Sequence, residues 1–244
     1  MSLGPLNLKF FREAAERLAA NGCSSRRVLS LGYPDILASP SSLERVLGAD
    51  VVARLTYRED SAEIRRWHGI QAEVPLAEAR SLFSAMGFEL DVIDIEAARG
   101  GEILQDLNHA VPESMHARYA AVIDGGTLEH CFNIGQAALN AANMTAVGGF
   151  VLHGNPINMY NHGFYNLSPV WYYDFYGANA FELEVAVLVN GPIDSPAMMN
   201  APLFKRFVGL TDNTTQIVVA RRKTLQPLKW PTQGKYLANP TLRG

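Results

Sequence analysis

The sequence predicts an α/β protein with a doubly wound, mostly parallel sheet and one antiparallel strand near the end. The first observation is the stretch from Tyr119 to Pro156, which has the pattern of a buried strand, a polar turn, a helix and a second buried strand. Such short, continuous apolar runs are typical of strands covered on both faces, as in parallel sheets. The second observation is that strand-like and helix-like segments alternate along the chain. The third is a closing pair of strands, Phe181–Val189 and Gln216–Ala220, which places the antiparallel strand at the end of the sheet.

Composition excludes several classes of function. The 244 residues are 48% hydrophobic with a net charge of −3, so the chain lacks the basic surface expected for binding nucleic acid or an anionic membrane. It has neither a signal pattern nor an apolar run long enough to span a bilayer, so we expect a cytoplasmic protein that acts on a small molecule. Cys23 and Cys131 are too few for a disulfide framework and are expected to be free thiols. The further partners left open are a second copy of the chain, as a homodimer, and a partner protein.

The chain contains no internal repeat and no flexible linker, which favours a single domain over residues 1–244. Within it, we expect a core over about 25–223, followed by a proline- and glycine-rich C-terminal arm at 224–244 that lies on the surface. Residues 194–213, between the closing pair of strands, are expected to form an irregular insertion.

Several elements have recognisable ends. Asn7–Gly22 carries apolar residues at helical spacing and stops at a glycine. Ser41 and Glu44 form a capping box for a short helix, and Pro75–Met86 is expected to be a helix with proline at its first position. The other segments expected before residue 119 are strands at 27–32, 88–95 and 102–107, a weaker strand at 50–57 and a charged, solvated segment at 58–68.

The central unit has a helix whose ends are also marked. Asn133 and Gln136 have the pattern of an N-cap and its reciprocal partner, and Gly148-Gly149 is expected to end the helix before the strand Phe150–His153. Ser168-Pro169 has the pattern of the start of a later helix. In a right-handed crossover unit the polar turn lies at the carboxyl end of a strand, where open α/β sheets bind ligands. The site-bearing edge is therefore expected to include Asp124, Gly125, Gly126, Thr127, Glu129 and His130.

Several motifs together resemble the class I S-adenosylmethionine-dependent methyltransferases over roughly residues 25–190. They are Val28–Gly32, Asp94, Asp106-Leu107-Asn108, Ile123–His130, Gly148–His153 and Ser168-Pro169, and the resemblance is greatest to uncharacterised bacterial members with "DGGTLEH" and "NHGFY…SP" segments. The resemblance implies a Rossmann-like methyltransferase fold and methyl transfer from S-adenosylmethionine to a small-molecule substrate. It assigns cofactor binding to Gly32, Tyr33, Asp94, Asp106, Leu107, Asp124 and Gly125.

The acid on the ribose side of the cofactor has two candidates. It is expected about 20 residues beyond the first strand, and Glu59 lies nearer to that spacing than Asp94 does. Asp94 is preferred because Asp106 and Asp124 then follow in the family's order.

The turn after the first strand departs from the family's pattern. Glycines there normally let backbone N–H groups close on the methionine end of the cofactor. Here Gly32 is followed by Tyr33-Pro34-Asp35, in which proline has no N–H and tyrosine tolerates positive φ poorly. The sequence therefore predicts weak or absent affinity for S-adenosylmethionine.

This departure supports an alternative function in which the fold is kept and methyl transfer is lost. The chain would then catalyse another reaction, such as an intramolecular substitution with loss of a leaving group in natural-product biosynthesis, or it would serve as a binding or partner subunit. A fold alone does not decide between such functions.

The catalytic candidates are Asp35, Glu129, His130 and His162. The substrate-binding candidates are Asn155, Tyr160 and Tyr165, from a long polar and aromatic loop of the kind that forms a lid or a substrate wall. The six histidines show no spacing such as His-x-x-x-His, so no metal site is predicted.

Asp124 and Glu129 are expected at the mouth of the site, with Asp35 and His162 nearby. Replacing Asp124 by alanine should then remove activity and change the melting temperature by only a few degrees, as for a surface residue. A plain tight turn at Asp124 and packing roles for Glu129 and His130 are the competing interpretations.

Overall fold

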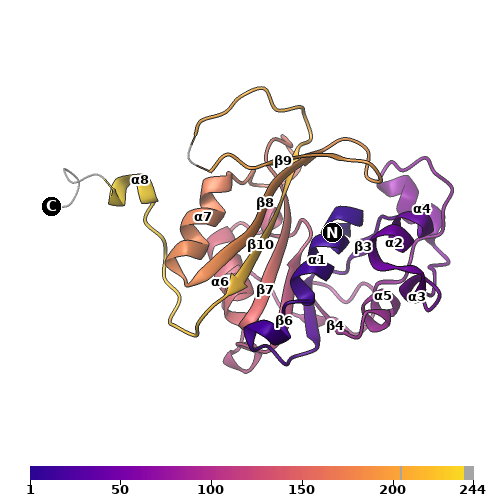
Figure 1. Cartoon of the computed structure of the whole chain (residues 1–244), viewed down its shortest axis with the longest axis horizontal. Coiled ribbons are helices and arrows are strands. Elements are labelled where there is room, and N and C mark those ends of the chain that lie inside the picture. The colour runs from indigo at the N-terminus through magenta and orange to yellow at the C-terminus, as the bar shows by residue number, and fades with distance from the viewer. Residues whose placement is uncertain (204, 239–244) are drawn as a thin grey trace.

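The computed structural model describes residues 1–203 and 205–238, so the last residues of the predicted C-terminal arm, 239–244, lie outside the described part. Its centre is an eight-stranded sheet (Figure 1). In spatial order the strands are β5 (Ile103–Leu104), β4 (Glu89–Asp94), β2 (Arg27–Leu31), β6 (Tyr119–Asp124), β7 (Thr145–Pro156), β10 (Thr215–Arg222), β8 (Phe181–Asn190) and β9 (Ala197–Asn200).

The strand directions confirm the predicted fold class. The five strands from β5 to β7 are parallel to one another, and β10 runs antiparallel between β7 and β8. The short edge strand β9 pairs antiparallel with β8 and lies inside the segment predicted to be an irregular insertion. The sheet is thus mostly parallel, with its antiparallel pairings at one end.

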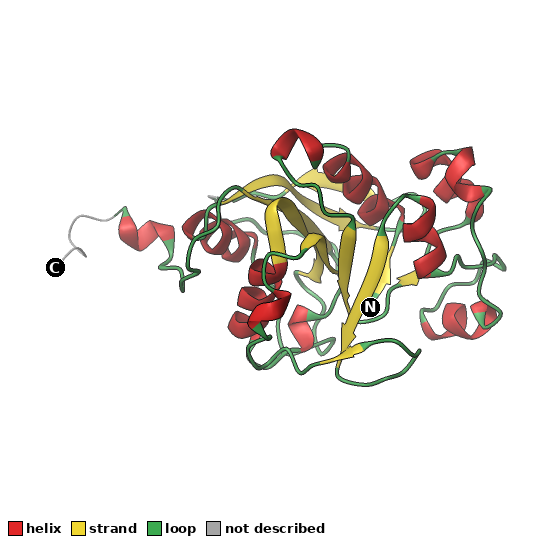
Figure 2. Cartoon of the chain, turned by 90° about the horizontal axis from the view of Figure 1, so that it is seen from below, coloured by secondary structure: helices red, strands yellow, loops and turns green. Residues whose placement is uncertain are grey.

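Helices cover both faces of the sheet, which makes it doubly wound (Figures 1 and 2). One face carries α1 (Pro5–Ala15), α2 (Pro40–Leu47), α3 (Ala49–Val52) and α5 (Ala79–Ala85), and the other carries α6 (Ile134–Met144) and α7 (Pro169–Ala178). Adjacent residues of β2 belong to different cores: Val28 lies in the cluster that contains Phe11, and Leu29 lies in the cluster that contains Tyr172. This alternation is the two-residue period of a strand buried on both faces.

The smaller elements complete the chain. They are β1 (Ser2–Leu3), which pairs in parallel with β3 (Asp35–Ile36), α4 (Ser61–Trp67), α8 (Gly234–Leu237), and the 3₁₀ turns η1 (Ala19–Asn21), η2 (Glu113–Met115) and η3 (Leu128–His130). Among the described helices, none combines the length and the apolar character needed to cross a membrane.

Three predicted segments in the first half of the chain are wrong. Residues 50–57 are not a strand, because residues 49–52 form α3 and pack Val51 and Val52 against the first core. The helix predicted from Pro75 begins only at Ala79, because the Glu78 carboxylate accepts hydrogen bonds from the N–H groups of Arg80 and Ser81 and caps it there. Residues 58–68 are not merely a solvated segment, since they contain α4 with its buried Ile64.

Other boundaries differ by less. The N-cap of α2 is Ser39 rather than Ser41, because Pro40 takes the first helical position and the Ser39 hydroxyl accepts the Ser42 N–H at 3.2 Å. The strand predicted at 102–107 is only two residues long, and the regular part of the first helix ends at residue 15.

Gly148-Gly149 does not end α6, which stops at residue 144, but lies within β7. Gly148 has a φ of +76°, and a Cβ there would lie 2.1 Å from the carbonyl oxygen of Asn21. Glycine is therefore required at this position because two backbone segments approach closely. The sequence alone does not distinguish a glycine needed for this reason from one that ends a helix.

Candidate functional site

The carboxyl ends of β2, β4, β5 and β6 meet around a cleft of about 460 Å³. This is the edge at which open α/β sheets bind ligands, and the volume falls within the range of about 300–1,000 Å³ typical of small-molecule sites. Of the residues predicted to act in catalysis or cofactor binding, those that line it are Gly32, Tyr33, Asp35, Asp94, Asp106, Leu107 and His130. The structure thus brings together seven candidates that come from four separate loops.

The floor of the cleft lies between Gly32 and Asp94. Gly32 has a φ of +83°, and a Cβ there would lie 3.7 Å from Oδ2 of Asp94 and 3.5 Å from the hydroxyl oxygen of Thr127. The other carboxylate oxygen of Asp94 accepts the N–H of Ile95 at 2.7 Å. Asp94 therefore presents Oδ2 to the cleft. Glu59, the alternative acid, is exposed and does not line the cleft.

The loop after β5 forms a second wall. Oδ1 of Asp106 accepts the backbone and side-chain N–H groups of Asn108, both at 2.8 Å, and these bonds hold the pKa of Asp106 below its ordinary value. Asn108 in turn accepts the N–H of Asn133 at 2.7 Å, which ties this wall to the start of α6. Leu107 is buried, so the loop offers an apolar surface beside a fixed carboxylate.

The turn after Gly32 is occupied by contacts within the protein. The Tyr33 hydroxyl donates to Glu78, and burial together with that hydrogen bond raises the pKa of Tyr33. The N–H groups of Gly32, Asp35 and Leu37 donate to the carbonyl oxygens of residues 93, 1 and 3 respectively. These backbone donors are therefore not available to a ligand.

Asp35 faces three basic side chains rather than open solvent. Its carboxylate lies 3.1 Å from His68 Nε2, 3.2 Å from an Arg99 nitrogen and 3.8 Å from an Arg58 nitrogen, and the Asp35 side chain is 5% exposed. The Arg99 guanidinium also lies over the ring of Tyr33, 5.1 Å from its centroid. Arg99 lines the cleft but was missed by sequence reasoning, because it lies in a loop without any motif.

Asp124 is not at the mouth of the site, and the expectation that it behaves as a surface residue is wrong. Its side chain is 0% exposed, and Oδ1 accepts the N–H groups of Thr127 at 2.8 Å and Leu128 at 3.1 Å. Oδ2 lies 2.7 Å from His153 Nδ1. Burial is the largest single influence and would raise the pKa of Asp124, but the hydrogen bond and charge of His153, with the hydrogen bonds from Asn155 and the Thr127 N–H, together outweigh it and the pKa is lowered. The competing interpretation, in which Asp124 is a turn residue, therefore holds, since Asp124 fixes the backbone of residues 127 and 128.

The buried network continues through β7 into α7. The ring of His153 links Asp124 to α7, since its Nδ1 faces Asp124 and its Nε2 lies 2.5 Å from the Tyr176 hydroxyl oxygen. Asn155, two residues along β7, donates to Asp124 at 2.8 Å and to Oε2 of Glu129 at 2.9 Å. Asn155 was predicted to contact substrate, and the structure places it inside this network with 0% exposure.

Glu129, His130 and His162 lie together beside the cleft. One donor atom of each residue lies within 4.8 Å of those of the other two, and Oε1 of Glu129 is 3.6 Å from His162 Nε2. The rings of His130 and His162 are 5.0 Å apart. Burial and the nearby charge of Asp124 raise the pKa of Glu129 to about 7, whereas burial and His162 lower the pKa of His130. Three of the four predicted catalytic residues therefore form one group, and Asp35 lies apart from it.

The remaining candidates lie outside the cleft. Tyr160 is 81% exposed, and the Tyr165 hydroxyl donates to the Phe132 carbonyl oxygen at 2.8 Å. A Cβ on Gly125 would lie 2.7 Å from the Ser2 carbonyl oxygen, so Gly125 faces β1 and a neighbouring hollow of about 260 Å³.

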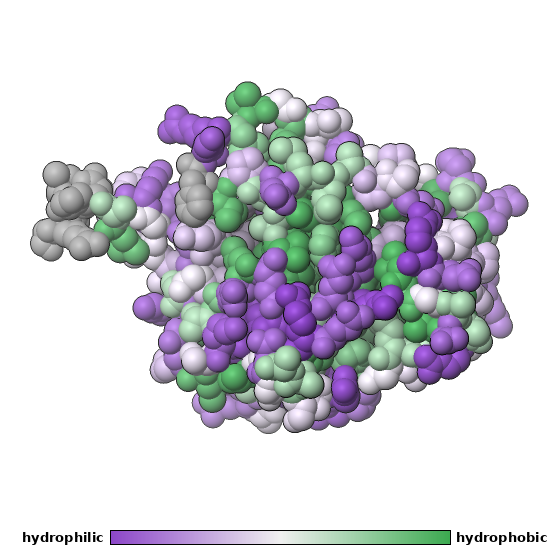
Figure 3. Space-filling view, in the orientation of Figure 1, coloured by the Kyte–Doolittle hydropathy of each residue, from purple (hydrophilic) through white to green (hydrophobic). Residues whose placement is uncertain are grey.

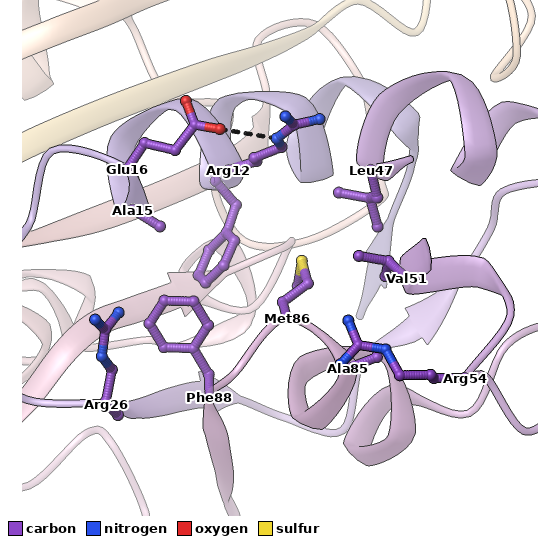
Figure 4. A pocket seen from close by; sticks show the side chains of 11 residues that line it. Arg12, Ala15, Glu16, Arg26, Leu47, Val51, Arg54, Ala85, Met86 and Phe88 are labelled. Carbon is purple, nitrogen blue, oxygen red and sulfur yellow. Dashed lines mark hydrogen bonds and ion pairs between the residues drawn. The ribbon is translucent and has the colours of Figure 1, made fainter. Parts of the chain in front are cut away.

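A further hollow of about 330 Å³ lies near the opposite, amino-terminal edge of the sheet (Figure 4). Apolar side chains such as Phe11 and Met86 line it, together with Arg12, which bonds to Glu16 at 2.9 Å. It lies under α1, over which hydrophilic side chains gather on the surface (Figure 3). Its position away from the carboxyl ends of the strands makes it the weaker candidate for the site.

The fold and the cleft define an α/β protein of the Rossmann-like class with a cleft at the carboxyl edge of its parallel strands. No protein-family model matches the chain, and no curated protein matches it. Among solved structures, it is similar to a mutant of the 16S rRNA (adenine(1408)-N(1))-methyltransferase from Catenulisporales acidiphilia. That match has a TM-score of 0.39 and 11% sequence identity, and it covers 93% of this chain and 96% of the other. At this level the match carries no argument about what this chain binds.

Proposed function

We propose that the chain transfers a methyl group from S-adenosylmethionine to a small-molecule substrate, with the cofactor in the cleft at the ends of β2, β4, β5 and β6. The observation that carries the proposal is that Gly32, Asp94, Asp106 and Leu107, which the resemblance assigns to the cofactor, line one cleft although they come from three different loops.

The chemistry of the cleft suits an adenosyl group. The inward-facing Oδ2 of Asp94 is a hydrogen-bond acceptor suited to ribose hydroxyls. Leu107 and Ile95 offer apolar surface for the adenine ring, and a site of mostly apolar surface with a few placed polar groups is typical of small-molecule recognition.

Methyl transfer itself asks little of the protein beyond position. A nucleophilic atom of the substrate attacks the methyl carbon, the carbon–sulfur bond breaks, and its electron pair stays on the sulfur as a neutral thioether. Holding the two reactants in line supplies most of the acceleration. The proton released by the nucleophile needs an acceptor, and His130 lines the cleft with a lowered pKa that keeps its ring neutral.

Calorimetry tests the proposal directly. The full chain is titrated with S-adenosylmethionine and with S-adenosylhomocysteine, alongside Asp94→Asn and the control Glu96→Gln, which removes an exposed charge two residues further on. We expect saturable binding that Asp94→Asn weakens and Glu96→Gln leaves unchanged. Absence of binding by either ligand at millimolar concentration would overturn the proposal.

One observation favours the second function, in which methyl transfer has been lost. The backbone N–H groups of Gly32, Asp35 and Leu37 are bonded within the protein, and Pro34 has none. These groups would therefore not serve as donors to the methionine end of the cofactor. If neither adenosyl ligand binds, the cleft belongs to another ligand and this second function takes the place of the first.

A further inference from the structure

Two histidines and a carboxylate converge where η3 meets the loop that follows β7. Glu129 and His130 belong to η3, and His162 comes from the loop, 32 residues further along the chain. Their donor atoms lie within 4.8 Å of one another. Donors bound to one tetrahedral Zn²⁺ at about 2.0–2.1 Å would lie roughly 3.4 Å apart. The Glu129–His162 separation of 3.6 Å is already close to that value, and small rotations of two exposed histidine side chains would bring in the third donor.

The Glu129 carboxylate is held in place by buried side chains on the side away from the histidines. Asn155 donates to Oε2 of Glu129, and its own amide oxygen accepts from the Tyr172 hydroxyl. This leaves Oε1 directed toward His162 and toward Gly126, where a Cβ would lie only 3.2 Å from it. Metal-binding carboxylates are typically held in this way by a second layer of hydrogen bonds.

The loop that carries His162 is fixed onto η3 rather than left free. The N–H groups of Phe164 and Tyr165 both donate to the Glu129 carbonyl oxygen, at 2.8 and 3.3 Å. Gly163 permits this approach, since a Cβ there would lie 2.9 Å from the same oxygen. The position of His162 beside Glu129 is therefore built into the backbone.

We propose that Glu129, His130 and His162 bind one divalent first-row transition metal ion, with Zn²⁺ as the representative ion. Two imidazoles and one carboxylate suit such ions, whereas Mg²⁺ and Ca²⁺ prefer all-oxygen ligands. Three protein ligands leave at least one coordination position open, as in catalytic rather than structural sites. His130 also lines the cleft, so the open position adjoins it.

The role of the metal rests on the proposed function. A hydroxyl of the substrate would bind through its oxygen at the open position and lose its proton to solvent water more easily there, since a bound divalent cation lowers the pKa of a coordinated oxygen acid. With the metal bound, His130 is a ligand and water takes its place as the proton acceptor. The substrate class is then a small molecule with a hydroxyl that can reach the metal and the cleft together. The metal site departs from the sequence prediction, which found no metal-ligand spacing.

Metal binding can be measured without the cofactor. The full chain is freed of metal with a chelator and titrated with Co²⁺, followed by its visible absorption, and Zn²⁺ is then added in competition. The variants are Glu129→Gln, His130→Ala and His162→Ala. Glu129→Gln keeps the shape and the contact with Asn155, and both histidines are exposed, so all three variants are expected to fold. The control is His116→Ala, an exposed histidine outside the cluster.

We expect one Co²⁺ per chain, displaced by Zn²⁺ and not by Mg²⁺, with affinity at least about tenfold weaker in each of the three variants and unchanged in the control. Circular dichroism melting checks that each variant is folded. Equal affinity in wild type and His162→Ala, or loss of binding in the control, would overturn the metal site. Failure of S-adenosylhomocysteine to bind would leave this result standing and would remove only the role in methyl transfer.

Discussion

Replacing Asp124 by alanine removes the acceptor at the centre of the buried network. Four donors lose their partner: His153 Nδ1, Asn155 Nδ2 and the backbone N–H groups of Thr127 and Leu128. Breaking a buried charged pair by removing one member costs about 3–5 kcal/mol. For a chain of this size, 1 kcal/mol corresponds to about 2–4 °C in melting temperature. We therefore expect the melting temperature to fall by about 6–20 °C.

The comparison with Asp124→Asn separates charge from shape. Asparagine keeps an oxygen for the two backbone N–H groups but loses the charge opposite His153, so we expect a smaller loss of about 1–3 kcal/mol. Because the folded pKa of Asp124 is lowered, the stability from its charge is present above the ordinary value of 3.8 and is lost as the pH falls through the folded pKa. The difference between wild type and Asp124→Asn should therefore shrink below pH 3.8.

The assay is thermal unfolding followed by circular dichroism, with urea unfolding as a second measure. The control is Glu96→Ala, an exposed acid for which a change within about 0.5 kcal/mol is expected. A melting temperature for Asp124→Ala within a few degrees of wild type would refute the reasoning and return Asp124 to the surface role predicted from sequence.

Arg221 is 0% exposed and bonds to Glu184 and to the carbonyl oxygens of residues 148 and 14. We therefore expect Arg221→Ala to lower the free energy of unfolding, measured in urea, by about 3–5 kcal/mol. For the exposed control Lys223→Ala we expect a loss of about 0.5 kcal/mol or less. Similar losses in the two variants would contradict this. Gly163→Ala should weaken Co²⁺ binding at least about tenfold by shifting the loop, whereas Gly177→Ala, whose Cβ would meet no described atom within 4 Å, should not; equal affinities would count against the fixed loop. The dissociation constant of S-adenosylhomocysteine should lie in the high-micromolar to millimolar range, because two missing hydrogen bonds to charged groups cost about 1.5–3 kcal/mol each and 1.4 kcal/mol is about tenfold in affinity. A low-micromolar value from calorimetry would contradict that expectation.

The fold was predictable because its central strands are buried on both faces. Runs such as Tyr119–Ile123 lack the alternation that a surface strand would show, and helices begin after Asn133 and Ser168 as predicted. Asn133 caps its helix, but Ser168 makes no side-chain cap hydrogen bond and the Gln136 side chain bonds to Asn140 rather than to Asn133. The segments that were mistaken are short or depend on distant contacts. The start of α5 depends on Glu78, whose carboxylate is also bound by the Tyr33 hydroxyl from 45 residues away, and the two-residue β5 is too short to leave a periodic pattern.

The candidate site was predictable only in part. Residues at strand ends, such as Asp94 and Asp106, could be placed because parallel strands all end at one edge. The burial of Asp124 could not, because it depends on the register that sets Asp124 against His153. A signal was present: His153 and Asn155 are two residues apart in a buried strand, so both face the same side as each other and need a polar partner there.

The buried network around Asp124 and the cluster of Glu129, His130 and His162 are joined by a single side chain, that of Asn155. The orientation of the cluster therefore depends on the network. Asn155 binds Asp124 on the buried side and Glu129 on the side of the cluster. The network therefore stabilises the fold and orients one oxygen of Glu129, while the other oxygen is left for His162. Because His162 takes no part in the network, its loss should affect only what the cluster binds. Because Asn155 belongs to both, its loss should affect the stability of the fold and the binding together.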